Sequence, residues 1–189
     1  MKNKCMLAIG ALSLAAAPTL AQDGWVTLFD GTNLDSWSEI GNADWTVADG
    51  VVEGSGESGH LLSNESYSDF VLTLEFWVDD PANSGVFIRC ADPETVSPNT
   101  CYEVNIFDQR EDQTYRTGGI VNFAAPDAQI DAGGQWNSYE IRAEGPRLHI
   151  TLNGTVTVDI EDDTYAEGPF TLQYGSGVVR FRNVRIQPL

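Results

Sequence analysis

Hydrophobic and polar residues alternate with a period of two along most of this chain, a pattern that is typical of strands with one buried face. The clearest case runs from Phe70 to Val78, and shorter segments with the same alternation lie at 86–89 and 102–106. If these three strands pair in sequence order, as neighbouring strands usually do, their outward side chains form one polar patch. The predicted patch contains Glu75, Trp77, Arg89, Glu103 and Asn105, with Asp108 at the end of the third strand.

The rest of the chain consists of short alternating segments separated by clusters of Gly, Asn, Asp and Ser, without a long segment of helical period. The pairs Asp49-Gly50 and Asn153-Gly154 predict tight hairpin turns. Further predicted strands are 25–29, 45–48, 51–54, 60–63, 119–123, 139–143, 148–152, 156–160, 170–174 and 178–187. The residues between 139 and 160 form a meander that we assign to a back sheet. About a dozen short strands and no helix predict an all-β protein with two packed sheets, a sandwich or jelly roll.

The first residues have the composition of a signal peptide. Lys2 and Lys4 precede an apolar run that ends at Ala17, and small residues follow at a cleavage site before Gln22. The apolar run is too short to span a membrane. We therefore expect a signal peptide over 1–21, one domain over 22–189, and export to the periplasm or the medium.

Charge limits the partners of the protein. The sequence carries 28 acidic residues against 10 Lys and Arg, a net charge of −18, and removal of Lys2 and Lys4 with the signal peptide takes it to −20. Such a surface repels nucleic acid and anionic lipid, so we expect no nucleic acid partner and no membrane association after cleavage. An acidic domain without lysine also suits export into salty water, where ions screen self-repulsion.

Two cysteines, Cys90 and Cys101, remain after removal of the signal peptide. An oxidising compartment favours a disulfide between them, although two unpaired thiols are the alternative. The disulfide would join the second and third strands of the predicted patch. A loop of this size stabilises a protein by roughly 3 kcal/mol in the chain-entropy model.

The ionisable residues of the patch admit two interpretations. Glu103 beside Arg89 suits an acid or base at the floor of a cleft, but the same pair also neutralises a crowded sheet face. Asp108 either assists Glu103 or ends a strand. No cofactor is predicted, although a divalent cation such as calcium has a candidate oxygen set in Asp108, Glu111 and Asp112, whose spacing does not match a calcium loop.

Other residues are candidates for contacts with a sugar. Asn83 and Ser84 either orient a hydroxyl group or only form a turn into the strand. Trp45, like Trp77, is suited to stacking on a sugar ring, although core packing is the commoner role of an aromatic residue. His60 lies outward near glycines and is a candidate contact or base.

Gln173 lies outward on its strand and completes the patch only if that strand joins the same sheet. The polar loop 108–116 lies beside the patch, where loops commonly carry binding groups. The sequence has no Ser-His-Asp motif, nucleophile elbow, phosphate-binding loop or zinc spacing, so these reaction classes have no support.

An ordered set of short segments resembles the 3-keto-disaccharide hydrolase domain family, also called DUF1080, a concanavalin A-like or LamG-like jelly roll of exported bacterial proteins. The matching segments are GWVTLFDGTNLDSW at 24–37, WTVADGVVEG at 45–54, YSDFVLTLEF at 67–76, NSGVFIR at 83–89, YEVNIFD at 102–108, TGGIVN at 117–122, WNSYEI at 136–141, LNG at 152–154 and FRNVRI at 181–186. The resemblance covers nearly the whole of 22–189, and the order of the segments makes it specific.

This resemblance implies cleavage of glycosides whose sugar carries a ketone at carbon 3. The ketone acidifies the hydrogen on C2, so a base can remove it, the glycosidic oxygen can leave, and water can add. The reaction needs a base, an acid and a donor for the enolate. Matching family positions are held by Asn83, Ser84, Arg89, Glu103 and Asp108. The chain departs from the family pattern at Asn105, where Gln is common, and at Trp77, where Arg is common.

Two hypotheses follow. The first is an exported hydrolase or lyase that acts on 3-keto-glycosides, with Glu103 transferring protons, Arg89 stabilising negative charge and Asp108 assisting. The alternative is a non-catalytic carbohydrate-binding or surface-interaction module, because jelly rolls host both. The sequence lacks a nucleotide fingerprint, so a separate sugar oxidoreductase would have to supply the ketone.

Overall fold

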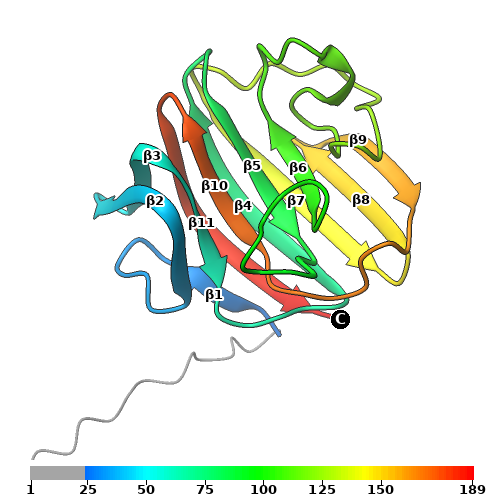
Figure 1. Cartoon of the computed structure of the whole chain (residues 1–189), viewed down its shortest axis with the longest axis horizontal. Helices are drawn as coiled ribbons and strands as arrows, with labels where there is room; N and C mark the ends of the chain where they lie inside the picture. The colour runs from blue at the N-terminus through cyan, green and yellow to red at the C-terminus, as the bar shows by residue number, and fades with distance from the viewer. Residues whose placement is uncertain (1–23) are drawn as a thin grey trace, which may run out of the picture.

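Eleven antiparallel strands form a curled sheet in the computed structural model, which describes residues 24–189 (Figure 1). They are β1 (Val26–Phe29), β2 (Trp37–Ala48), β3 (Val51–Ser63), β4 (Phe70–Val78), β5 (Asn83–Ile88), β6 (Tyr102–Ile106), β7 (Trp136–Glu144), β8 (Arg147–Leu152), β9 (Thr155–Glu161), β10 (Thr171–Ser176) and β11 (Val179–Pro188), with one 3-10 helix, η1 (Gln113–Tyr115). The predicted signal peptide at 1–21 lies outside the described residues. No helix long and apolar enough to cross a membrane occurs within 24–189.

The strand order β6-β5-β10-β3-β11-β4-β7-β8-β9 folds back on itself, with β2 paired to β3 and β1 to β11. We call β2, β3, β10, β5 and β6 the front sheet, and β1, β11, β4, β7, β8 and β9 the back sheet. The long strand β3 joins them, since its first residues pair with β11 and its last with β10. The predicted all-β, two-sheet jelly roll is confirmed, and so is the meander of β7, β8 and β9 in the back sheet.

The core lies between the two sheets and takes alternate residues from both. Leu72 and Phe76 of the back sheet belong to one continuous apolar cluster with Val86, Val104 and Leu172 of the front sheet, and all five are buried. A hydrogen bond also crosses the core, because the Tyr139 hydroxyl donates to the Asn105 carbonyl over 2.7 Å. Burial of alternate apolar side chains therefore fixes which face of each strand points into the core and which points outward.

The predicted pairing of the three opening strands is wrong in one respect. β5 does pair with β6, but β4 lies between β11 and β7 in the back sheet. The connection Asp79–Ala82 lacks an Asn-Gly type hairpin pair, and it carries the chain from one sheet to the other. The outward residues of β4 consequently lie on the opposite side of the molecule from those of β6.

Two local predictions also differ from the structure. The segments 51–54 and 60–63, predicted as separate strands, are parts of the single strand β3, and the glycines between them lie within that strand. Gly54 is required there, since a Cβ atom would lie 2.7 Å from the Cβ of Tyr174. The segment 119–123 forms isolated bridges beside β6 instead of a strand. Both predicted hairpin turns are confirmed by positive φ angles at Asp49, Gly50, Asn153 and Gly154.

Candidate active site

Strand register brings polar residues from four strands onto the outer face of the front sheet. Directly paired residues of antiparallel strands point to the same face. One row across β3, β10, β5 and β6 consists of His60, Gln173, Gly85 and Asn105. The adjacent row consists of Leu62, Thr171, Phe87 and Glu103. The prediction that Gln173 joins the sheet of Glu103 is thus confirmed.

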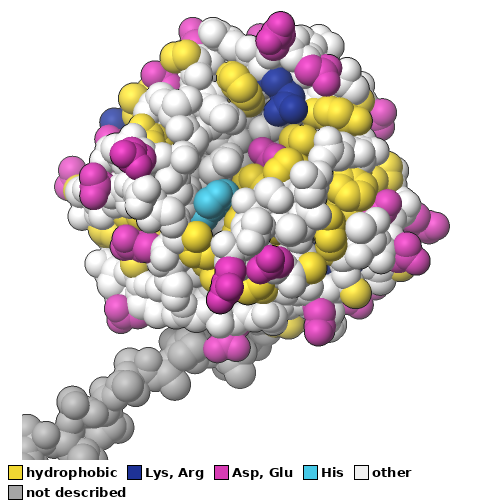
Figure 2. All heavy atoms as spheres, in the orientation of Figure 1, with side chains coloured by type: hydrophobic (Ala, Val, Ile, Leu, Met, Phe, Trp, Pro, Cys, Tyr) yellow, Lys and Arg dark blue, Asp and Glu magenta, His cyan; other side chains and the backbone are white. Residues whose placement is uncertain are grey.

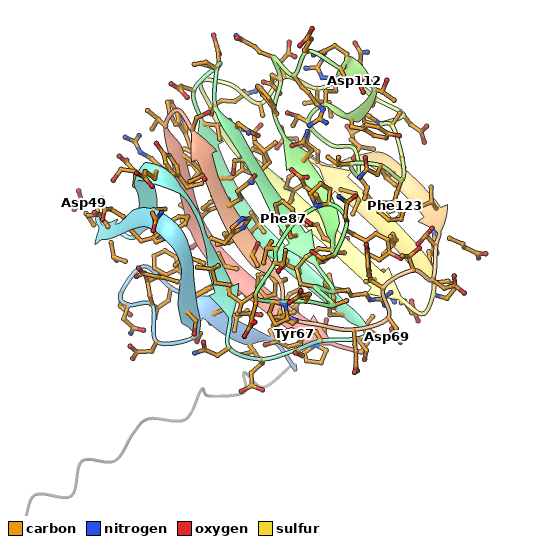
Figure 3. The ribbon with its side chains drawn as sticks, viewed as in Figure 1. Asp49, Tyr67, Asp69, Phe87, Asp112 and Phe123 are labelled. Atoms are coloured by element: carbon orange, nitrogen blue, oxygen red, sulfur yellow. A yellow bond between two sulfur atoms is a disulfide. The ribbon has the colours of Figure 1, made fainter. Side chains whose placement is uncertain are left out.

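Gly85 lies between these residues, and the side chains of Glu103 and Phe87 pack against it. A Cβ atom on Gly85 would lie 3.3 Å from Cγ and Oε1 of Glu103 and 3.4 Å from the Phe87 ring, so any side chain here would crowd both. Figure 2 shows this face hollowed near its centre, with a histidine at the border and an acidic side chain recessed within it. Phe87, labelled in Figure 3, lies near the middle of the same sheet. We call this hollow the front site.

Glu103 is buried in the front site, with 6% of its surface exposed. Burial raises the pKa of its carboxyl group to about 7, against the opposing attraction of the Arg110 guanidinium. No hydrogen bond to its carboxyl group occurs among residues 24–189. A carboxylic acid with this pKa can hold a proton near neutral pH and give it up, as a general acid must.

His60 lies at the other side of the front site. Its ring packs edge-on against Phe87, with the centroids 5.2 Å apart and the planes at 80°. Its Nδ1 atom lies 3.0 Å from the Thr171 hydroxyl oxygen. Burial lowers the pKa of His60 to about 4, so the imidazole is neutral at ordinary pH. These contacts fix the ring while its Nε2 atom makes no hydrogen bond within the described part of the chain.

Three polar atoms around the front site are buried without a hydrogen-bond partner among the described residues: Asn105 Oδ1, Gln173 Oε1 and Arg110 Nε. Asn105 is held in place through its Nδ2 atom, which donates to the Tyr115 carbonyl over 2.5 Å. Buried polar atoms are normally paired, so unpaired ones call for an explanation such as a ligand or ordered water. Two acceptors and one donor around a hollow are suited to the hydroxyl groups of a sugar.

Arg89 does not lie beside Glu103, which contradicts its predicted role. Its backbone has a φ angle of 50°, so the alternation of β5 ends there and the side chain turns away. The guanidinium, 1% exposed, donates to the carbonyls of Ser68 and Gly145 and to the Asp69 carboxylate. Figure 3 shows Asp69 at the end of the sandwich opposite the loop that carries Asp112. Arg89 therefore joins three segments away from the front site.

The Asp108 carboxylate is held by hydrogen bonds within the fold. Its carboxylate accepts from the Thr117 hydroxyl at 2.5 Å and from the backbone N–H groups of Ala132 and Gly133 at 2.7 and 2.9 Å. These bonds tie the loop after β6 to the loop before β7. The candidate calcium set is not assembled: within residues 24–189 no three His, Cys, Asp or Glu side chains gather in a metal site.

Glu75 and Trp77 lie on the outer face of the back sheet and not in the front site. Glu75 accepts from Arg182 Nε at 2.7 Å and from Asn183 at 3.0 Å, and Trp77 lies under the Arg180 guanidinium. A groove of about 590 Å³ also lies there, and Glu75 lines it. Glu75 is already paired, whereas polar atoms of the front site lack partners among the described residues, so the front site is the candidate active site.

The remaining predicted residues separate into two groups. Asn83 has the parity of Gly85 and Phe87 on β5 and therefore faces the front side. Ser84 points into the molecule, where its fully buried hydroxyl donates to the Gln173 carbonyl at 2.7 Å. Trp45 packs against the main core, which does not support a stacking role.

The predicted disulfide between Cys90 and Cys101 is present and connects the ends of β5 and β6. Both cysteines are buried against Phe87, so the disulfide supports the floor of the front site.

Sequence reasoning missed Arg110 and Gly85. The polar loop 108–116 was expected beside the site, but no pattern singled out Arg110 within it. Gly85 follows Asn83 and Ser84, the two residues with a predicted turn or binding role, and was not itself a candidate. Its position between His60 and Glu103 depends on the pairing of β5 with β10, which joins residues almost ninety positions apart and leaves no local signal.

The fold and the front site define the class of protein, a jelly roll of the architecture that lectins use. Known structures agree with this class. A candidate glycosyl hydrolase from Parabacteroides distasonis superposes with a TM-score of 0.77 at 20% identity, over 91% of this chain and 99% of that one. A second candidate glycosyl hydrolase from that organism gives 0.74 at 25% identity, over 87% and 99%. The carbohydrate-binding module CBM66 from Bacillus subtilis gives 0.65 at 20% identity, over 80% and 95%.

The family is defined by sequence. The 3-keto-alpha-glucoside-1,2-lyase-like domain matches residues 24–187, so the chain belongs to this family, and a carbohydrate ligand is implied. The chain is also 32% identical over 78 residues to a 3-keto-disaccharide hydrolase from Bacteroides thetaiotaomicron. That match covers 34% of this chain and 27% of the relative, about a quarter of its length.

Proposed function

We propose that this protein is an exported enzyme that cleaves 3-keto-glycosides in the front site, with Glu103 as the acid that protonates the leaving oxygen. The observation that carries the proposal is the buried Glu103 carboxyl group, which lies in a hollow without a hydrogen-bond partner among the described residues and has a pKa raised to about 7. Family membership supplies the substrate class, since the family's domain is named for a 1,2-lyase-like reaction on 3-keto-glucosides.

The proposed reaction begins at C2 of the sugar. A base removes the C2 proton, and the electron pair of that C–H bond forms an enolate with the C3 ketone. The enolate then collapses to a C1–C2 double bond while the C1–O bond breaks, and the leaving oxygen takes the proton of Glu103. Addition of water, OH to C1 and H to C2, gives the free 3-keto-sugar and restores the starting protonation states.

Arg110 takes the place that was predicted for Arg89 in stabilising negative charge. Its guanidinium lies close enough to lower the pKa of Glu103, and its buried Nε–H has no acceptor among residues 24–189. A fixed donor in a site shielded from water stabilises a developing oxyanion strongly. Asn105 Oδ1 and Gln173 Oε1 would accept hydrogen bonds from the remaining sugar hydroxyls.

The test is turnover of a 3-keto-disaccharide by the purified protein. Loss of the acid should lower kcat/KM of Glu103→Gln by about 10²- to 10⁴-fold. The matched control is Glu75→Gln on the back sheet, which should leave kcat/KM within about threefold because Glu75 lies outside the site. Equal turnover by the wild-type protein and Glu103→Gln would remove the catalytic assignment.

Binding of the sugar without turnover by the wild-type protein would instead support a carbohydrate-binding module. The fold shared with CBM66 and the unpaired acceptors of the front site favour this second function. Export has its own test. Protein recovered from cells should begin near Gln22, and an intact Met1 terminus would contradict the proposed signal peptide.

A further inference from the structure

We propose that His60 is the base that removes the C2 proton, and that the sugar ring lies over Gly85 between His60 and Glu103. This inference rests on the proposed function and assigns the group that the reaction still lacks. His60 lies on β3 and Glu103 on β6. The register of the four strands β3, β10, β5 and β6 places both side chains on the same face of the sheet. The two groups would act on adjacent atoms, C2 and the oxygen on C1.

The spacing of the strands suits a single ring. Three strand separations of about 4.8 Å put the backbones of His60 and Glu103 roughly 14 Å apart, and their side chains reach inward from both sides. The His60 ring already extends over Thr171 to meet Phe87. Gly85 lies between the two groups and has no side chain of its own, so the Glu103 carboxyl group can lie against the backbone there.

The protonation states decide which group is the base. His60 is neutral above a pH of about 4, and Glu103 is protonated below a pH of about 7, so both are ready between these values. The opposite assignment needs a protonated His60 beside an ionised Glu103, and both are minor forms within that interval. Arg110 is the charged group that faces Glu103, while the neighbours of His60 on β10 and β5 are Thr171, Gln173 and Phe87, all uncharged.

The hydrogen bond to Thr171 also orients the base. In the tautomer with hydrogen on Nδ1, the ring donates to the Thr171 hydroxyl and presents the lone pair of Nε2. Nε2 has no hydrogen-bond partner among the described residues, so it is available to the substrate. Thr171 is fully buried and therefore holds the ring in one orientation.

The experiment compares two 3-keto-glucosides, one with a sugar and one with nitrophenol as leaving group. Because nitrophenolate leaves without a proton, Glu103→Gln should lose about 10²- to 10⁴-fold on the sugar glycoside but recover most activity on the nitrophenyl glycoside. His60→Gln should lose about as much on both, since both need the base. His60→Gln should also stop the exchange of the C2 hydrogen in D₂O, whereas Glu103→Gln retains it.

The control is His149→Gln on β8 of the back sheet, which should behave as wild type. Rescue of His60→Ala by added imidazole would show that a folded variant lacks only the base. Cleavage of the nitrophenyl glycoside by His60→Gln within about threefold of wild type would overturn the inference while the proposed function stands. Failure of the wild-type protein to cleave either substrate would overturn the proposed function, and the inference with it.

Discussion

The outer faces of the two sheets carry similar residue types, but the polar groups are paired on the back sheet and unpaired in the front site. On the back sheet, Arg180 and Arg182 each pair with a glutamate and lie over a tryptophan ring. In the front site, the Glu103 carboxyl group has no hydrogen bond within residues 24–189, and acceptor atoms of Asn105 and Gln173 are buried without donors. Paired groups are explained by the fold itself, whereas unpaired buried groups reduce stability and point to a ligand.

The same contrast applies to two arginines, one buried and one partly exposed, that each pair with a carboxylate. Replacement of Arg89 by Met should destabilise the protein by about 3–5 kcal/mol, because it removes the donor to the carbonyls of Ser68 and Gly145 and the cation paired with Asp69, whose carboxylate keeps only the backbone N–H of Gly145 among the described residues. Arg182→Met removes a partly exposed pair and should cost about 1 kcal/mol or less. Urea denaturation of both variants measures the two losses in free energy of unfolding. Equal losses would contradict the predicted difference between the buried and the partly exposed arginine.

The burial of the Glu103 carboxyl group should make the stability of the protein depend on pH. Its pKa is raised from 4.5 to about 7 on folding, so its contribution to stability is full below pH 4.5 and is lost as the pH rises through about 7. The shift corresponds to about 3 kcal/mol. Glu103→Gln should therefore be more stable than wild type at pH 8 by up to about 3 kcal/mol, with the gap closing towards pH 4.

Chemical denaturation of the two proteins across this pH range measures the gap, and His60 contributes equally to both curves. A difference that does not change with pH would mean that the Glu103 carboxyl group is not desolvated. Glu75→Gln, on the back sheet, is the matched control, since its carboxylate is paired with Arg182 and Asn183.

The disulfide links stability to the floor of the front site. Replacement of Cys90 and Cys101 by Ser should lower the free energy of unfolding by about 3 kcal/mol or somewhat less, from the loss of the constraint on the unfolded chain. Because both sulfurs pack against Phe87, the double variant should also bind sugar more weakly. Thermal unfolding and calorimetry check the two effects, and an unchanged stability would contradict the first.

The alternation of apolar and polar residues predicted the buried face of each strand but not every side-chain position. Alternation placed Leu72, Phe76 and Val104 in the core correctly, because a strand buried on one face imposes a period of two. It failed for Arg89, since a positive φ angle at the end of β5 reverses the side chain and no neighbouring residue signals it.

The pairing of strands was harder to predict from the sequence than the buried face of each strand. Glu103 and Asn105 were correctly placed together on β6, but Glu75 was assigned to them by assuming that β4 pairs with β5. The crossing between sheets depends on how both faces of the core fit, which is a property of the whole chain. For the same reason, the neighbourhood of His60 and Glu103 appeared only in the folded molecule.

The most direct test of the front site is a binding measurement at Gly85. In a Glu103→Gln background, in which cleavage should be slower by about 10²- to 10⁴-fold, calorimetry gives the affinity for a 3-keto-disaccharide. Adding Gly85→Ala should weaken binding by about 10²-fold, because the new Cβ would lie 3.3 Å from residue 103 and displace the sugar ring. Thr73→Val in the back groove should leave the affinity unchanged. Unchanged affinity with Gly85→Ala, together with a loss with Thr73→Val, would move the sugar site to the back sheet and contradict this account.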